Sequence, residues 1–300
     1  MKVLPKLTYA SPDDPLPKQM FIRSLERLTG RRRLERIYDT VLGTEADHGK
    51  LWGAALREMR VRVDYAPAQL AKVPTEGPVI LIANHPYGVL DGLIICHFAS
   101  LIRPHFKILI HKALNREPRV EKYMLPIDFD ASEEAVLTNI ETKRRAMETL
   151  RDGNAVVIFP AGGISTTVNG PFGRAVDLEW KLFVTKLIQM TSATIVPIYF
   201  HGQNSRIFQM ASHVSETLRL ALIIHEVNRK MGKTVRVTIG DPIPYAALSG
   251  IRRRQELLYH LRESIYALSQ QKINHYPPAR LPSEKRALKQ MKQKESGGYR

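Results

Sequence analysis

The sequence predicts an α/β fold in which a central mixed β-sheet is covered by helices and preceded by an N-terminal arm of amphipathic helices. From Pro78 onward, short runs rich in β-branched residues alternate with longer runs of helical periodicity, as is typical of such sheets. Before that point, apolar residues recur mainly at steps of three and four. The chain has 300 residues, 44% hydrophobic and 25% charged, so it can bury a full hydrophobic core.

The arm, residues 1–72, contains two amphipathic patterns. Residues 21–42 predict a helix that breaks near Gly30, and residues 52–63 predict a second helix. Arginines occupy the polar positions of both patterns. Such helices either pack on the core with a solvated face or lie in a lipid interface. Because arginines are combined with Phe21 and Trp52, we expect a membrane-interface arm, with the solvated face as the alternative.

Residues 73–270 are expected to form the sheet and its covering helices. The predicted strands are residues 79–83, 106–110, 155–159, 194–200 and 235–239. The predicted helices are residues 90–102, 133–151, 176–190, 214–231 and 253–270. Residues 271–300 are rich in lysine and proline and predict a flexible basic tail, either an inert solvated end or a segment drawn to an anionic surface.

The formal charge of +16 predicts attraction to a polyanion, either nucleic acid or anionic lipid. Zinc-finger spacing and aromatic RNA-binding signatures are absent from the sequence, so we expect no nucleic-acid partner. The single cysteine, Cys96, excludes an internal disulfide and fits a reducing compartment. The opening residues lack the apolar core of a secretory signal, and no apolar run approaches the roughly 20 residues of a spanning helix. We therefore expect peripheral membrane contact.

The segment VILIANHPYGVLDG, residues 79–92, is the strongest candidate for chemistry. It places His85 at the end of a predicted strand, where ligands bind in open α/β sheets. Pro86 and Gly88 allow a turn that returns Asp91 to the imidazole, so that Asp91 fixes the tautomer and His85 acts as a base. A capped turn is the structural alternative. Because the chain has no G-x-S-x-G elbow, we expect the nucleophile to be the hydroxyl of the substrate.

Two further polar clusters follow predicted strands. VVIFPAGGIST, residues 156–166, contains a glycine pair whose N–H groups can form an anion-binding nest. IVPIYFHGQNSR, residues 195–206, ends in a run of polar side chains. Scattered histidines show no metal-ligand spacing, and we expect no metal.

These segments carry a family resemblance. NHPYGVLDG, FPAGGIS and IVPI resemble the first, third and fourth blocks of the glycerolipid acyltransferases related to lysophosphatidate acyltransferase, and residues 106–128 are similar to the second block. The resemblance covers residues 78–244. It implies the glycerolipid acyltransferase fold, with His85 as general base and Asp91 as its partner. It also implies a fatty acyl donor that is acyl-CoA or acyl carrier protein, with no resident cofactor.

The candidate acceptor- and donor-binding residues lie in and around these blocks. They are Asn84, Tyr87, Lys112, Phe159, Pro160, Ala161, Gly162, Gly163, Ser165, Pro197, His201, Asn204 and Arg206.

Two departures from the family pattern refine the expected acceptor. Asp91 follows His85 by six positions where the family has five, and Ala161 and Ile164 stand where the family has charged residues. Both resemble a bacterial branch that contains ornithine-lipid O-acyltransferases and haemolysin-like proteins. This implies a lyso-aminolipid acceptor of the ornithine-lipid type, with lysophosphatidate as the alternative, and a location at the cytoplasmic face of the inner membrane. A lipase or thioesterase, in which His85 activates water, is the competing enzyme class.

Overall fold

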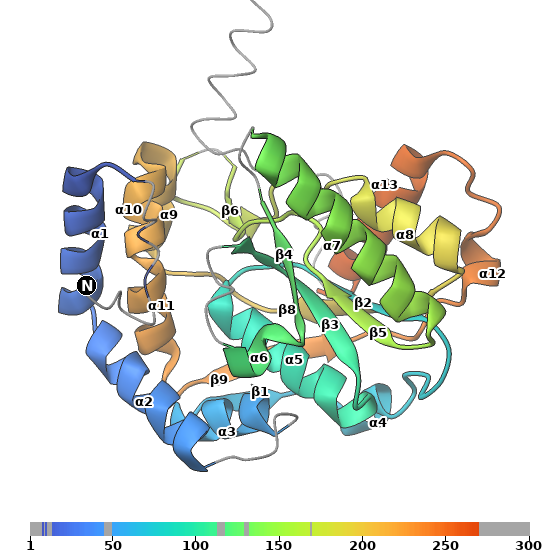
Figure 1. Ribbon diagram of the computed structural model, residues 1–300, viewed down its shortest axis with the longest axis horizontal. Helices are drawn as coiled ribbons and strands as arrows, with labels where there is room; N and C mark the ends of the chain where they lie inside the picture. The colour runs from blue at the N-terminus through green and yellow to red at the C-terminus, as the bar shows by residue number, and fades with distance from the viewer. Residues whose placement is uncertain are drawn as a thin grey trace, which may run out of the picture.

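A seven-stranded sheet forms the centre of the molecule (Figure 1). The computed structural model describes residues 8, 10, 14–44, 50–112, 118–128, 132–168 and 170–269. The strand order is β1-β9-β8-β2-β5-β3-β4. All neighbours pair in parallel except β8 and β9, which pair antiparallel, so the predicted mixed sheet is confirmed. The strands are β1 (Arg62–Asp64), β2 (Val79–Ala83), β3 (Phe106–His111), β4 (Met124–Ile127), β5 (Ala155–Ile158), β8 (Thr194–Phe200) and β9 (Thr234–Ile239).

Helices cover both faces of this sheet (Figure 1). They are α1 (Leu16–Leu28), α2 (Arg31–Thr44), α3 (Leu51–Glu58), α4 (Pro67–Leu70), α5 (Val89–Ile102), α6 (Pro118–Glu121), α7 (Glu133–Arg151), α8 (Phe183–Thr191), α9 (Arg206–Val214), α10 (Glu216–Ala221), α11 (Ile223–Lys230), α12 (Tyr245–Leu248) and α13 (Arg254–Ala267). None of the helices within the described ranges is long and apolar enough to cross a bilayer.

Strand β2 is the centre of the core because it is buried on both faces. Leu81 faces the cluster that includes α3 and α5, whereas Ile80 and Ile82 face the cluster that includes α7, α8 and α13. Alternate residues of a strand point to opposite faces, so five consecutive buried residues require a helical layer on each side. This is why the segment before His85 reads as an uninterrupted apolar run.

The arm differs from the sequence prediction after α3. The break near Gly30 is confirmed, because α1 ends at Leu28 and α2 begins at Arg31. The predicted helix 52–63 ends early at Glu58, and Arg62–Asp64 instead forms β1, paired in parallel with β9. The backbone hydrogen bonds that Arg62–Asp64 form with β9 outweigh the helical periodicity of this segment. Trp52 is 6% exposed and packs against Phe106, so it belongs to the core and not to a lipid-facing surface.

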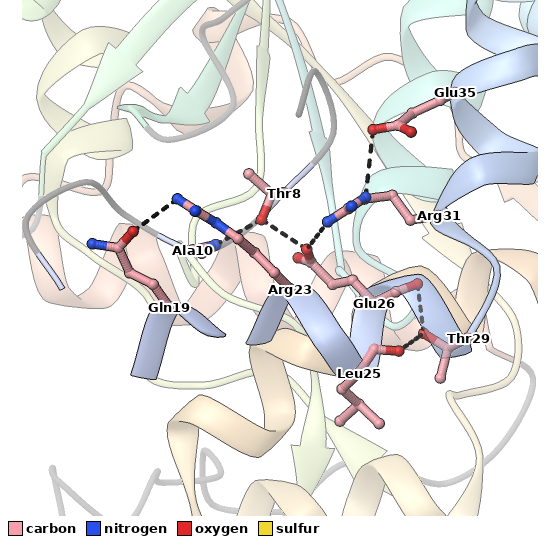
Figure 2. Close-up of polar contacts among 9 residues, drawn as sticks. All are labelled: Thr8, Ala10, Gln19, Arg23, Leu25, Glu26, Thr29, Arg31 and Glu35. Atoms are coloured by element: carbon pink, nitrogen blue, oxygen red, sulfur yellow. Dashed lines mark hydrogen bonds and ion pairs between the residues drawn. The ribbon is translucent and has the colours of Figure 1, made fainter. Parts of the chain in front are cut away.

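A buried carboxylate links α1 to α2 (Figure 2). Glu26 is fully buried, accepts a hydrogen bond from Thr8 Oγ1 at 2.7 Å, and lies 3.3 Å from a guanidinium nitrogen of Arg31. Arg31 Nε lies 3.4 Å from Glu35 in the next turn of α2. Because a buried charge needs a partner, these contacts connect the two helices across the break near Gly30.

Several elements were not predicted correctly. Strand β4, helix α9 and the hairpin of β6 (Thr166–Thr167) and β7 (Ala175–Val176) were missed. The predicted helix 176–190 begins only at Phe183, since Val176 pairs in the hairpin. The predicted helix 214–231 is divided into α10 and α11, with Ser215 as the N-cap of α10. The predicted tail lies outside the described residues.

Candidate active site

The turn between β2 and α5 brings a histidine and an aspartate together. His85 Nδ1 lies 3.2 Å from Asp91 Oδ2. The same oxygen accepts backbone N–H groups from Tyr87 at 2.7 Å and Gly88 at 3.0 Å. The imidazole and the carboxylate are at ion-pair distance, but their alignment does not meet hydrogen-bond geometry. Catalytic hydrogen bonds commonly tighten only when substrate binds, so this alignment is compatible with a base and its orienting partner.

Gly88 makes the enlarged turn possible. Its φ of +74° lies in the region that favours glycine, and a β-carbon there would lie 2.6 Å from Ile164 Cδ1. The turn thus needs both the backbone freedom and the small size of glycine. The extra residue between His85 and Asp91 is accommodated without separating the two side chains.

Burial controls the protonation of the groups around His85. Burial raises the pKa of Asp91, while contacts with His85 and with the N–H groups of Tyr87 and Gly88 act in the opposite direction. Burial, followed by the charge of Asp91, also raises the pKa of Tyr87, whose hydroxyl donates to the His201 carbonyl at 2.6 Å. An imidazole held beside an ionised carboxylate can accept a proton on its other ring nitrogen.

The ring and backbone of His85 are held independently of Asp91. Phe159 stacks on the imidazole, with ring centroids 4.0 Å apart and planes 27° apart. The backbone N–H of His85 donates to Asp177 Oδ1 at 3.0 Å, and its carbonyl accepts from Ser165 N at 2.8 Å. Ser165 Oγ also donates to Asp177 Oδ1, at 2.6 Å. Phe159 and Ser165, which follow β5, together with Asp177 therefore fix the position of His85.

Asp177 was missed by sequence reasoning. It is fully buried, and besides His85 and Ser165 it accepts a hydrogen bond from Trp180 Nε1 at 2.9 Å. Its backbone N–H donates to the Tyr266 hydroxyl at 2.8 Å. One carboxylate thus joins three separate segments beneath the histidine. A sequence signal existed: Asp177 lies between the apolar residues Val176 and Leu178, and a carboxylate that such neighbours bury needs hydrogen-bond partners.

The third block forms the turn on which Ser165 sits. Pro160 and Ala161 are buried, and Gly162 donates its N–H to the Phe159 carbonyl at 3.0 Å. A β-carbon on Gly163 would lie 2.9 Å from Leu178 Cδ1. Ile164 packs in a cluster with Phe208 and Ile223. The two positions that lack the family's charged residues are therefore filled by core side chains.

The fourth block is joined to the first. The Asn84 side chain donates to the Phe200 carbonyl at 3.0 Å and accepts from Phe200 N at 2.7 Å, so it connects the ends of β2 and β8. Pro197 is buried within β8, in register with Ile82. The His201 ring contacts Thr238 Oγ1 at 2.7 Å. Asn84 thereby anchors the backbone directly before His85 to the end of β8.

The remaining candidates differ in their surroundings. Lys112 Nζ lies 2.7 Å from Asp128 Oδ2, at the sheet edge formed by β3 and β4. Arg206 is exposed, with its guanidinium 5.7 Å from the Phe172 ring centroid. Asn204 is 2% exposed, and neither amide atom has a hydrogen-bond partner within the part of the chain that the structure describes. In that same part, no group of three metal-ligating side chains occurs.

Several known proteins are similar to this chain. Residues 24–273 match the family model described as acyltransferase. A lyso-glycine lipid O-acyltransferase of Phocaeicola vulgatus is 26% identical over 210 residues, which cover 66% of this chain and 71% of that enzyme. The corresponding enzyme of Bacteroides thetaiotaomicron is 25% identical, covering 66% and 73%. The crystal structure of a 1-acyl-sn-glycerophosphate acyltransferase from Thermotoga maritima aligns with a TM-score of 0.48 and 16% identity, covering 87% of this chain and all of that chain. Because the family model spans most of its length, the chain belongs to the acyltransferase family.

Proposed function

We propose that this acyltransferase moves a fatty acyl group from an acyl thioester to the hydroxyl of a lyso-aminolipid, with His85 as general base and Asp91 as its partner. The observation that carries the proposal is the His85–Asp91 pair at the end of β2, with Asp91 fully buried and His85 17% exposed. The histidine is thus open to a substrate while its partner is shielded from water.

The chemistry follows from this geometry. An acceptor hydroxyl is a weak nucleophile until a base removes its proton. His85 takes that proton on the ring nitrogen that does not face Asp91, while the acceptor oxygen attacks the thioester carbonyl carbon. The carbon–sulfur bond then breaks, the new ester forms, and the imidazolium returns its proton to the leaving thiolate. Asp91 stabilises the imidazolium between these steps.

The acceptor is proposed from the third block and from the relatives. Ala161 and Ile164 are buried and uncharged, so these two positions supply no cation for a phosphate monoester. Both bacterial relatives are named for a lyso-glycine lipid. We therefore favour a glycine head group over the ornithine head group expected from the sequence. Acyl-CoA and acyl carrier protein both remain suitable donors.

A paired assay tests the proposal. Purified full-length enzyme is given one acyl donor and equal amounts of lyso-glycine lipid, lyso-ornithine lipid or lysophosphatidate, and the diacylated products are measured by mass spectrometry. The expected order is glycine, then ornithine, then lysophosphatidate. Preference for lysophosphatidate would overturn the aminolipid assignment, and thioester hydrolysis without transfer to any acceptor would favour the thioesterase class.

A further inference from the structure

A cationic cavity lies between the arm and the start of β9. Its volume is about 450 Å³. Its charged lining consists of Arg33 and Arg36 of α2 together with Glu58 and Arg60 at the end of α3, and Met231 and Gly232 close it from the turn before β9. Three arginines therefore face one carboxylate. The volume is sufficient for a head group or a nucleotide-sized ligand.

These arginines are not neutralised by the protein. Among the residues that the structure describes, no carboxylate lies within ion-pair distance of Arg33, Arg36 or Arg60. By contrast, Arg31 at the start of α2 contacts both Glu26 and Glu35. Guanidinium groups bind phosphate oxygens in paired hydrogen bonds, so unpaired arginines around a cavity favour a phosphate-bearing occupant.

The backbone of Arg60 gives independent support. Arg60 has a φ of +52° and directly follows the last turn of α3, which Val61 N closes by donating to the Leu56 carbonyl at 2.9 Å. Glycine is the usual residue at this point of a helix terminus, because a β-carbon is strained there. Glycine could adopt this backbone conformation without strain, so the turn does not require arginine. A strained backbone at an exposed arginine that lines the cavity points to a role for its guanidinium.

The end of α11 connects the cavity to the turn that carries His85. Met231 and Gly232 follow Lys230, whose ammonium lies 4.1 Å from the ring centroid of Tyr87, two residues beyond His85. Lys230, at the end of α11, therefore contacts the turn between β2 and α5, and the next two residues line the cavity. A coenzyme A thioester carries its phosphates at the far end of the pantetheine arm from the acyl carbonyl, so its phosphates would bind apart from His85.

We propose that the cavity formed by Arg33, Arg36 and Arg60 binds a phosphate ester. Two sources share this chemistry: the phosphates of coenzyme A and the phosphodiester of an anionic lipid. Only the link to the donor rests on the proposed function. Phosphate binding itself needs no turnover and is measured without it, so failure of the acyl-transfer assay and failure of this proposal are distinguishable.

The test uses the full chain and two probes. Free coenzyme A is titrated calorimetrically, and vesicles of phosphatidylglycerol or of phosphatidylcholine alone are sedimented with the protein. The variant Arg33→Gln/Arg36→Gln/Arg60→Gln is compared with Arg32→Gln, which removes an exposed charge from the same helix outside the cavity. We expect the triple variant to lose roughly 10-fold or more in affinity for at least one probe, and the control to change little.

Each outcome has one meaning. Weaker coenzyme A binding identifies the donor phosphates, and weaker binding to phosphatidylglycerol vesicles alone identifies lipid phosphate. Loss of both supports one shared phosphate site. The proposal is overturned if neither probe responds, or if Arg32→Gln weakens binding as much per charge removed.

Arg60→Gly separates binding from folding. Glycine relieves the strain at φ +52°, so the melting temperature should stay unchanged or rise, while probe affinity falls. A lower melting temperature with unchanged affinity would show that the side chain stabilises the fold, and would overturn the proposed role of Arg60.

Discussion

At the residue scale, the His85–Asp91 pair predicts a large and specific loss of activity on substitution. His85→Ala should lose about 10²- to 10⁴-fold in kcat while remaining folded, because no base then removes the proton of the acceptor. The double variant with Asp91→Asn should be little worse, since the two side chains act as one unit. If folded His85→Ala keeps more than about a tenth of wild-type kcat, the proposed mechanism is wrong.

Asp91 also predicts a trade-off between activity and stability. Burial raises the pKa of this carboxyl, so ionising it in the folded state costs free energy at neutral pH. Asp91→Asn keeps an acceptor for Tyr87 N and Gly88 N but removes that cost. Its melting temperature at pH 7 should therefore equal or exceed that of the wild type, although activity falls. The advantage should begin to shrink once the pH falls below the raised pKa, and it should vanish below the ordinary carboxyl pKa, where Asp91 is neutral in both the folded and the unfolded state.

Asp177 predicts a positioning effect. Asp177→Asn places an amide where one carboxylate oxygen accepts from Trp180 Nε1, so a donor would face a donor. We expect destabilisation of about 1–3 kcal/mol and a lower kcat with little change in KM, because His85 loses its backbone clamp. The neighbouring exposed residue provides the control, Glu179→Gln. Denaturant unfolding and steady-state kinetics separate the two effects, and an unchanged kcat in folded Asp177→Asn would contradict the positioning role.

At the element scale, α1 differs from an ordinary surface helix because it buries polar side chains and exposes large apolar ones. Its packed face carries Ile22 together with the polar Gln19 and Glu26, whereas Leu16, at 73% exposure, and Leu28, at 84%, point outward. Glu26 can be buried because Thr8 and Arg31 satisfy it (Figure 2). An apolar outer face is the composition of a helix that contacts a lipid interface.

The exposed face of α1 therefore predicts membrane binding. Replacing Leu16, Met20 and Leu28 by serine should weaken sedimentation with anionic vesicles without lowering the melting temperature, because these side chains are exposed. The matched control replaces Val136, Leu137 and Ile140, the exposed apolar side chains of α7. Equal losses in both variants would show that this face of α1 has no special role.

At the scale of the whole molecule, the charge of +16 predicts that membrane association is partly electrostatic. Vesicle binding should decrease as salt rises and as anionic lipid is removed, since exposed charges are screened within about 10 Å at 0.1 M salt. Removing residues 271–300 should weaken binding modestly because it deletes several lysines. Co-sedimentation assays measure both effects. Equal binding to neutral vesicles at high salt would exclude charge as the anchor, and stronger retention by nucleic acid would revive that alternative.

The sequence by itself determined the family, the mixed sheet with its helical layers, and the placement of His85 at a strand end. These features depend on local periodicity and on motifs whose residues are close in the chain, such as His85 and Asp91. Only the tertiary structure decided features that depend on distant partners. Pairing with β9 turned Arg62–Asp64 into a strand, and packing against Phe106 placed Trp52 in the core. Asp177 lies 92 positions beyond His85, so its contact with the histidine backbone exists only once β5, β7 and α13 have assembled around it.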